Sequence, residues 1–276
     1  MLDSNVLLNL YLFTRKSRLE FFEALDRVKD RLWVPHQVAA EFHANRLAAA
    51  QVHMKMFDAT SAALASVRRK AEDELTRFGK AHALTKAEID TLVSPIVEAI
   101  ERSTEAVRSR ANDFDITVDQ VVVDDPILRY LGDLLDGHTG TSFSPAERAD
   151  LEQEFRKRAQ EEVPPGYLDA QKSTNASGDF LMWEQILREA QSNSRPILLV
   201  TNEVKQDWVL RSSGFTVGAR PELVQEMHSR AAVDFLLMDA GAFLYIVNEI
   251  FDVSLSDSTM EQAERPLPAD VERIVM

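Results

Sequence analysis

Hydrophobic positions in the first part of the chain, up to about residue 57, show helical spacing around one short apolar run. We expect Ser17 to cap a helix, because a serine hydroxyl accepts hydrogen bonds from free backbone amides at a helix start. The apolar residues of this helix recur about one turn apart, at Leu19, Phe22, Leu25 and Val28. Residues 31–34 (RLWV) predict a short strand closed by Pro35, and an alanine-rich helix is expected from Val38.

Residues 58–162 consist almost entirely of charged residues and residues that favour helix. Apolar side chains repeat with helical spacing in residues 64–75 and 89–100, and Pro95 is expected to start or kink a turn. Breaks are expected at residues 124–126 and 137–140. Because an α/β pattern resumes afterwards, we interpret residues 58–162 as a helical insertion within a single domain that spans residues 1–276.

The last part of the chain returns to short strands and amphipathic helices. PPGY at residues 164–167 predicts a turn, a helix is expected after Gly178, and ILLVT at residues 197–201 predicts a buried strand. Residues 222–251 are expected to be helical, and the chain is expected to fray from Leu255 onward. Strand, helix, insertion, helix and strand in this order predict an α/β fold, with a parallel sheet flanked by helices.

Composition narrows the class of protein. Apolar residues make up 45% of the 276 residues and charged residues 28%, which is typical of a soluble globular protein. No export signal or membrane span is evident, so we expect a cytoplasmic protein without membrane partners. The chain has no cysteine, which excludes disulfides, thiolate zinc sites and cysteine nucleophiles.

The net charge restricts how the chain would meet a polyanion. Lys and Arg number 31 and Asp and Glu 45, a formal charge of −14. Such a surface repels phosphates at long range, so a nucleic acid would need a local basic patch or bound cations.

Acidic residues near predicted strand ends are the main chemical signal. In a parallel α/β sheet, ligands gather at the carboxyl ends of the strands. Carboxylates brought together there repel one another and need a hard cation. The alternative is that these residues lie at strand ends and helix starts only because both are on the surface. The acidic residues concerned are Asp3, Glu41, Asp179, Glu203 and Asp207.

Several segments in a fixed order carry a family resemblance. These are DSNVLLNLY, WVPHQVAAEFHANR, PPGYLDAQK with GDFLMWEQIL, VTNEVKQDW and ARPELVQE, and the stretch DPILRYLGDLLDGHTGTSFSPAE fits as well. Together they resemble the PIN-like family of prokaryotic proteins, a branch of the PIN nuclease superfamily. The resemblance covers Asp3 to about Glu226 and implies a Rossmann-like sheet with a metal-dependent nuclease site of about four acidic residues.

The resemblance assigns roles to individual acids. Asp3 corresponds to the first PIN aspartate, Glu41 to the helix glutamate and Asp179 to the third acid. The fourth corresponds to Glu203, where the family usually has an aspartate, or to Asp207. These five residues are the implied catalytic and metal-binding set, with Mg²⁺ or Mn²⁺ as the metal.

Further polar residues lie near these acids, and the segment before the first of them is short. Asp169, in PPGYLD, is a weaker outer-sphere candidate, whereas Asn5 and Thr201 are short polar residues typical of turns. Only Met1 and Leu2 precede Asp3, so the first strand is either a stub or begins upstream of this sequence.

Basic and aromatic residues beside the matched segments are candidates for substrate contact. Arg46, Lys172, Lys205 and Arg220 would hold phosphates, although surface cations are usually just solvated. Trp183 is expected in the core. For Trp208, which follows a candidate acid, both core packing and stacking on a base stay open, because an aromatic ring near an open site could stack a base.

The function indicated is a two-metal phosphodiesterase that cleaves RNA or DNA, with RNA favoured. The missing cysteine and the lack of a zinc-type histidine motif fit such a mechanism, because bound metal generates the nucleophile. The rival is a catalytically silent PIN-like module that binds a protein partner through its helical insertion. A toxin or defence effector with an antitoxin partner is compatible with the nuclease.

Overall fold

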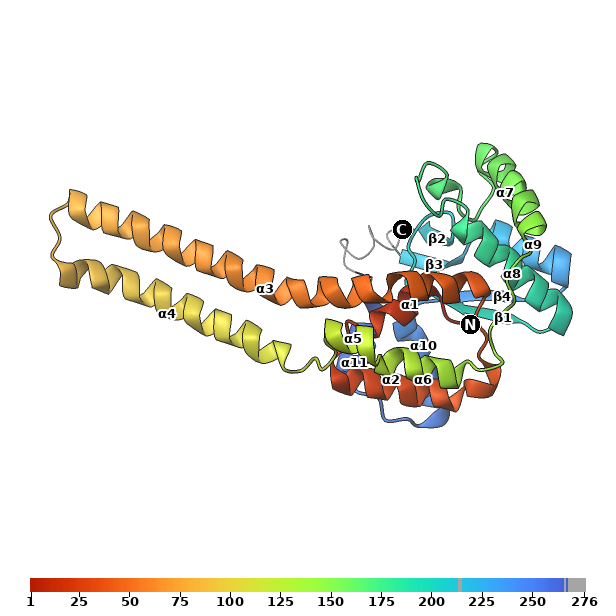
Figure 1. Cartoon of the computed structure of the whole chain (residues 1–276), viewed down its shortest axis with the longest axis horizontal. Helices are drawn as coiled ribbons and strands as arrows, with labels where there is room; N and C mark the ends of the chain where they lie inside the picture. The colour runs from red at the N-terminus through yellow and green to blue at the C-terminus, as the bar shows by residue number, and fades with distance from the viewer. Residues whose placement is uncertain (213–214, 266, 268–276) are drawn as a thin grey trace.

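The computed structural model describes residues 1–212, 215–265 and 267. Helices surround a small sheet, and two long antiparallel helices, α3 (His36–Ala81) and α4 (Lys86–Ala111), extend far from it (Figure 1). We call residues 58–111 the arm and the other described residues the body. No helix among the described residues has the length and apolar content to cross a bilayer.

Strand β1 (Ile197–Val200) lies at the centre of the main sheet. On one edge it pairs in parallel with β4 (Phe235–Met238), Ile197 facing Phe235. On its other edge the chain start runs parallel to it, because Val200 N donates to Met1 O and Asp3 N to Val200 O. The stub before Asp3 therefore makes sheet hydrogen bonds, and its Leu2 is fully buried. This small parallel sheet flanked by helices confirms the predicted α/β class.

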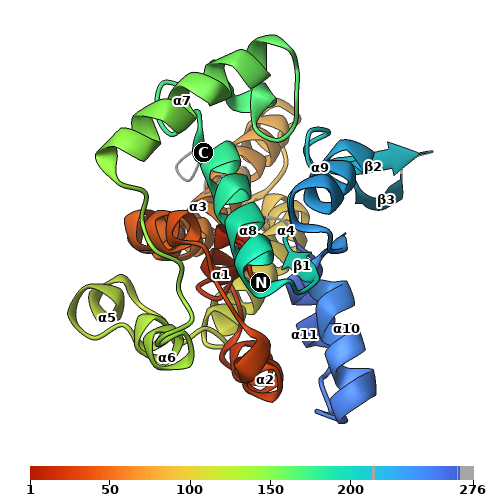
Figure 2. The same ribbon diagram turned by 90° about the vertical axis from the view of Figure 1, so that its right-hand side faces the viewer.

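Helices cover both faces of this sheet. Helices α8 (Gly178–Asn193) and α9 (Pro221–Ala231) lie on one side of β1, and α10 (Ala240–Phe251) and α11 (Asp257–Glu264) lie on the other (Figure 2). Trp183 of α8 is fully buried against Phe235 of β4, with 4.9 Å between ring centroids. Trp183 thus belongs to the core, as the sequence predicts.

Two expectations about the last hundred residues are wrong. Residues 222–251 are not one helical stretch, because β4 separates α9 from α10. The chain also does not fray at Leu255, since α11 follows and packs on α10 and on α2 (Arg15–Arg27). The end of the predicted frayed tail, from residue 268, lies outside the described residues. An antiparallel pair, β2 (Val209–Ser212) and β3 (Phe215–Ala219), forms a separate hairpin.

Two local predictions near the N-terminus also fail. Thr14, rather than Ser17, caps α2, because the Thr14 hydroxyl accepts from Ser17 N at 3.3 Å. Residues 31–34 form no strand. The turn η1 (Lys29–Arg31) leads instead to one parallel bridge between Val34 and Thr139. Helix α1 (Ser4–Asn9) begins directly after Asp3.

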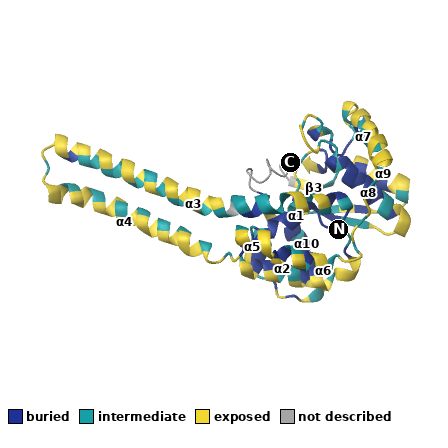
Figure 3. Cartoon of the chain, viewed as in Figure 1, coloured by how far each residue is buried: buried dark blue, intermediate teal, exposed yellow. Residues whose placement is uncertain are grey.

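The predicted insertion boundary at residue 58 falls inside a continuous helix. No Gly or Pro interrupts α3 before Gly79, so the alanine-rich helix of the body runs unbroken into the arm for 46 residues. Helix α4 starts with a reciprocal capping box between Thr85 and Glu88, and Pro95 lies within it. None of its residues is buried, and the arm is mostly exposed (Figure 3).

The chain between the arm and the second half of the sheet returns to the body. It forms α5 (Val118–Val123), α6 (Pro126–Leu134), α7 (Pro145–Gln160) and the turn η2 (Tyr167–Asp169). The expected break at residues 124–126 is the start of α6, which Asp125 caps. The buried hydrophobic residues of this stretch include Ile116, Val121, Ile127, Leu131 and Phe155. Residues 58–162 are therefore mainly helical, but only the arm leaves the body.

Candidate functional site

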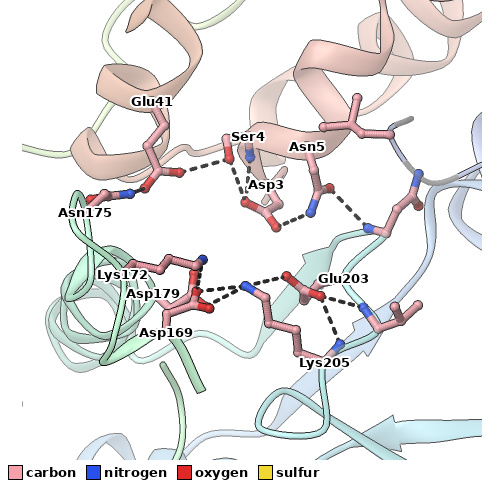
Figure 4. A pocket seen from close by; sticks show the side chains of 13 residues that line it. Asp3, Ser4, Asn5, Glu41, Asp169, Lys172, Asn175, Asp179, Glu203 and Lys205 are labelled. Carbon is pink, nitrogen blue, oxygen red and sulfur yellow. Dashed lines mark hydrogen bonds and ion pairs between the residues drawn. The ribbon is translucent and has the colours of Figure 1, made fainter. Parts of the chain in front are cut away.

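A small acidic pocket of about 70 Å³ lies at the carboxyl end of β1 and of the short segment, residues 1–2, that runs parallel to it. Parallel strands bring their carboxyl ends to the same edge of a sheet, which is why Asp3 and Glu203 meet there. Figure 4 shows the side chains that line the pocket. They come from the chain start with α1, from α3, from η2 and the segment that joins it to α8, from the start of α8, and from the segment after β1. Five carboxylates line the pocket: Asp3, Glu41, Asp169, Asp179 and Glu203.

Asp3 is held by neutral donors on both carboxylate oxygens. Its Oδ1 accepts from the Ser4 amide at 2.6 Å, and its Oδ2 accepts from Thr201 Oγ1 at 2.6 Å and Asn5 Nδ2 at 2.8 Å. Burial raises the pKa of Asp3 to about 6. The Thr201 hydrogen bond opposes this rise, and the charge of Glu41 adds to it.

Glu41 also contacts neutral donors. Ser4 Oγ donates to its Oε2 at 2.9 Å, and Oε1 accepts from Gln37 Nε2 at 2.8 Å and from Asn175 Nδ2 at 2.9 Å. Gln37 and Glu41 lie one turn apart on α3, so the buried Gln37 amide holds the Glu41 carboxylate that lines the pocket. Ser4, which contacts both Asp3 and Glu41, links these two acids.

The other three carboxylates surround one lysine. Lys205 Nζ lies 2.8 Å from Asp169 Oδ2, 3.1 Å from Glu203 Oε2 and 3.5 Å from Asp179 Oδ2. Burial opposes the positive charge, but these carboxylates outweigh it and hold the pKa of Lys205 above its usual range. Lys172 Nζ, at 2.5 Å, also pairs with Asp169.

Asp179 and Asp169 differ in their electrostatics. Burial raises the pKa of Asp179, in the first turn of α8, to about 7. The charge of Lys205 lowers this pKa and the charge of Asp169 raises it. Burial alone would also raise the pKa of Asp169, yet hydrogen bonds from Lys172 and Lys205 hold it below its usual range. The pocket therefore carries more negative charge than its two lysines balance.

Three of the predicted site residues lie elsewhere. Asp207 is fully buried outside the pocket, where its Oδ2 accepts from the Gly166 amide at 2.8 Å. Arg46 donates to Asp125 Oδ2 at 2.7 Å and to Val121 O. Arg220 pairs with Glu222 and donates to Gln206 O at 2.9 Å. The structure thus places Glu203, rather than Asp207, at the fourth corner of the predicted acidic set.

Trp208 does not offer its ring to a nucleic-acid base. It is 1% exposed, and its indole Nε1 donates to Asp179 Oδ2 at 3.1 Å. Its ring packs edge-on against Trp183, with 6.1 Å between centroids. Trp208 therefore orients Asp179 from the core side.

Sequence reasoning missed three polar residues of the pocket, Ser4, Asn175 and Asn202. Ser4 follows the first aspartate directly, and Asn175 lies in the polar stretch before α8. The only signal for Asn175 is its short polar neighbourhood ahead of a helix start, which is common in loops without function. Asp169, the weaker candidate, lies fully within the pocket as a partner of both lysines.

A family model described as a PIN-like domain matches residues 1–223. The chain belongs to the PIN-like family. Comparison with curated proteins and with solved structures found no match. The matched part of this PIN-like protein contains all five pocket carboxylates and ends before β4. PIN-like domains form a superfamily that generally contains nucleases.

The donor chemistry of the pocket fits a hard divalent cation. Carboxylate oxygens are the ligands that Mg²⁺ and Mn²⁺ prefer, and five carboxylates line this one pocket. Burial, and after it the neighbouring carboxylates, raises the pKa values of Asp3 and Asp179, and a bound cation would stabilise both groups in their ionised form. Among the described residues, no three His, Asp or Glu side chains are already arranged as a metal site.

Proposed function

We propose that this PIN-like protein is a Mg²⁺- or Mn²⁺-dependent nuclease that hydrolyses phosphodiester bonds. The observation that carries the proposal is the convergence of Asp3, Glu41, Asp179 and Glu203 in one pocket of a PIN-like domain. These residues come from four distant parts of the chain. Asp169 adds a fifth carboxylate to the same pocket.

The pocket residues divide the work of binding. Asp3, Glu41, Asp169, Asp179 and Glu203 would hold the cations. When bound, such cations lower the pKa of a coordinated water and stabilise the leaving oxygen. Ser4 and Thr201 fix the direction of Asp3, and Trp208 fixes that of Asp179. Lys172, whose side chain is 26% exposed at the pocket, is placed to contact a phosphate.

We infer that the substrate is a flexible single strand, with RNA favoured over DNA. The pocket is narrow, at about 70 Å³, and two of its carboxylates, Asp3 and Asp169, are buried. A single strand can bend one phosphate into such a space, whereas a stiff duplex cannot. Single-stranded nucleic acid in a cell is mostly RNA.

The test is cleavage of labelled single-stranded and double-stranded RNA and DNA by purified protein with Mn²⁺, with Mg²⁺ or with EDTA. Cleavage of single strands is expected with either metal and none with EDTA. Glu41→Gln should lose cleavage, because its carboxylate charge is removed. Glu105→Gln, the same change at an exposed position of the arm, is the matched control and should retain it. Cleavage that survives both EDTA and Glu41→Gln would exclude this site.

A second candidate function is a partner-binding protein, either a silent module or a toxin or defence effector held by an antitoxin. The arm favours it, because large apolar side chains are exposed there, including Val67 at 54% and Phe78 at 51%. Co-expression with the product of a neighbouring gene, followed by size-exclusion chromatography, tests it. A complex that forms with the full chain and is lost on shortening the arm would support this function, and failure of the full chain to co-elute with the partner would oppose it.

A further inference from the structure

Lys205 lies at the point where a cation is needed. Its ammonium is within 3.5 Å of oxygens from Asp169, Asp179 and Glu203. These acids come from η2, the first turn of α8 and the segment after β1, three separate elements. Figure 4 shows the lysine reaching between them. Oxygens converging from several sides around one positive charge are also the surroundings of a bound metal ion.

The two halves of the pocket are neutralised differently. The Asp3 and Glu41 carboxylates accept from neutral hydroxyl and amide groups and from backbone N–H. The half around Lys205 has a full positive charge at its centre, and the Lys205 side chain is only 18% exposed. Without that charge, three carboxylates would face one another with little water between them, which is strongly unfavourable.

The position of Lys205 in the chain allows its side chain to move. It lies in the connection between β1 and β2, outside any helix or strand. A lysine side chain has four rotatable bonds and can move its ammonium several ångströms without backbone change. An ammonium and a divalent cation cannot both occupy the space between the same three oxygens, because like charges repel.

We propose that the Lys205 ammonium holds a cation position in the metal-free protein, and that a divalent cation binds these three carboxylates only when the ammonium leaves. The proposal rests on the proposed nuclease function and adds a role for one residue. Lys205 keeps the acidic half of the pocket folded before metal arrives, and it weakens metal binding because it must be displaced. The displaced ammonium stays tethered beside the pocket, where a substrate phosphate can accept its hydrogen bonds.

The test measures metal binding directly, by calorimetric titration of the full chain with Mn²⁺. Lys205→Met removes the competing charge and should tighten Mn²⁺ binding at least tenfold. The melting temperature in EDTA should fall, and the rise in melting temperature on adding Mn²⁺ should exceed that of the wild type. Lys205→Gln keeps a polar side chain and should show the same tightening, so the test stands if Lys205→Met fails to fold.

Lys70→Met is the matched control. Lys70 is exposed on the arm and does not line the pocket, so its removal should leave Mn²⁺ affinity unchanged. Mn²⁺ affinity that is unchanged or weaker in the Lys205 variants, with binding intact in the wild type, would overturn the displacement proposal and leave the nuclease proposal standing. Mn²⁺ binding to none of the proteins would overturn both.

Discussion

The body and the arm use the same kind of helix for different purposes. In the body, α8 has ten of its sixteen residues buried, and its first turn carries Asp179 into the pocket. In the arm, α4 is 26 residues long and none of its residues is buried. Helix length therefore says little about contribution to stability, which depends on the apolar area removed from water. The comparison also separates the acidic pocket, which lies in the body, from the arm, which contributes no residue to its lining.

The largest expected effect is on catalysis, from Asp179→Asn. The change removes the charge needed to hold a hard cation, so Mn²⁺-dependent cleavage should fall at least a thousand-fold, or about 4 kcal/mol in the activation barrier. In EDTA the fold should be equally or more stable, because burial and neighbouring acids disfavour the Asp179 carboxylate. Cleavage assays and thermal melts measure the two effects. Asp90→Asn, the same change at an exposed arm position, should alter neither.

The second-largest expected effect is the difference in unfolding free energy between a truncated side chain in the body and one on the arm. Trp183→Ala should lower the free energy of unfolding by about 3–5 kcal/mol, because the fully buried indole packs against Trp208 and Phe235. Phe78→Ala on the arm, where the ring is 51% exposed, should cost less than about 1 kcal/mol. Urea denaturation followed by circular dichroism compares the two. Equal losses of unfolding free energy would mean that the Phe78 ring is packed against other atoms in solution.

Dependence of stability on pH should reveal the buried acids of the body. The folded-state pKa values of Asp3 and Asp179, about 6 and about 7, exceed the ordinary aspartate value of 3.8. Each group therefore contributes stability that is fully present below about pH 4 and is lost as pH rises through its folded pKa. The test compares the wild type with the double variant Asp3→Asn/Asp179→Asn in EDTA. From pH 4 to 8, the unfolding free energy of the wild type should fall relative to that of the variant. A pH-independent difference would contradict the raised pKa values.

The smallest expected effect comes from shortening the arm. Replacing residues 61–107 by a short Gly-Ser linker leaves Phe57 and Phe114 in place, whose rings lie 5.6 Å apart at the base of the arm. Because α4 has no buried residue, the melting temperature should stay within a few degrees, and single-strand cleavage should stay within about threefold. A loss of cleavage without unfolding would mean that the arm controls the pocket.

The sequence predicted the acidic set well where strand direction decides the position. Asp3 and Glu203 follow neighbouring parallel strands, so topology alone brings them together. Asp207 lies four residues beyond Glu203 in a connection that turns back into the core, and no spacing rule shows that turn. Arg46 and Arg220 lie within matched segments, but each already pairs with an acid. Asp125, far away in the sequence, pairs with Arg46, and Glu222, two residues on, pairs with Arg220.

The strand β4 was missed for a different reason. Its four residues, FLLM, lie between two amphipathic helices and precede the apolar stretch of α10 almost directly. A run this short has no period of its own, so its parallel pairing with β1 decides its conformation. The continuity of α3 was likewise hidden, because the change from apolar to charged composition at residue 58 marks the edge of the body and leaves the helix itself unbroken.

The unbroken α3 makes the molecule a lever. Glu41 lies in the second turn of this helix, and Ala81 ends it 40 residues later, about 60 Å away at 1.5 Å per residue. A rotation of about 5° about the helix base displaces the far end by about 5 Å, while the Glu41 carboxylate moves by a fraction of an ångström. A force applied at the far end of α3 therefore produces a larger force near the base of the helix, as in a lever. A load on the outermost turns of α3 acts as torque on the turn that positions Glu41.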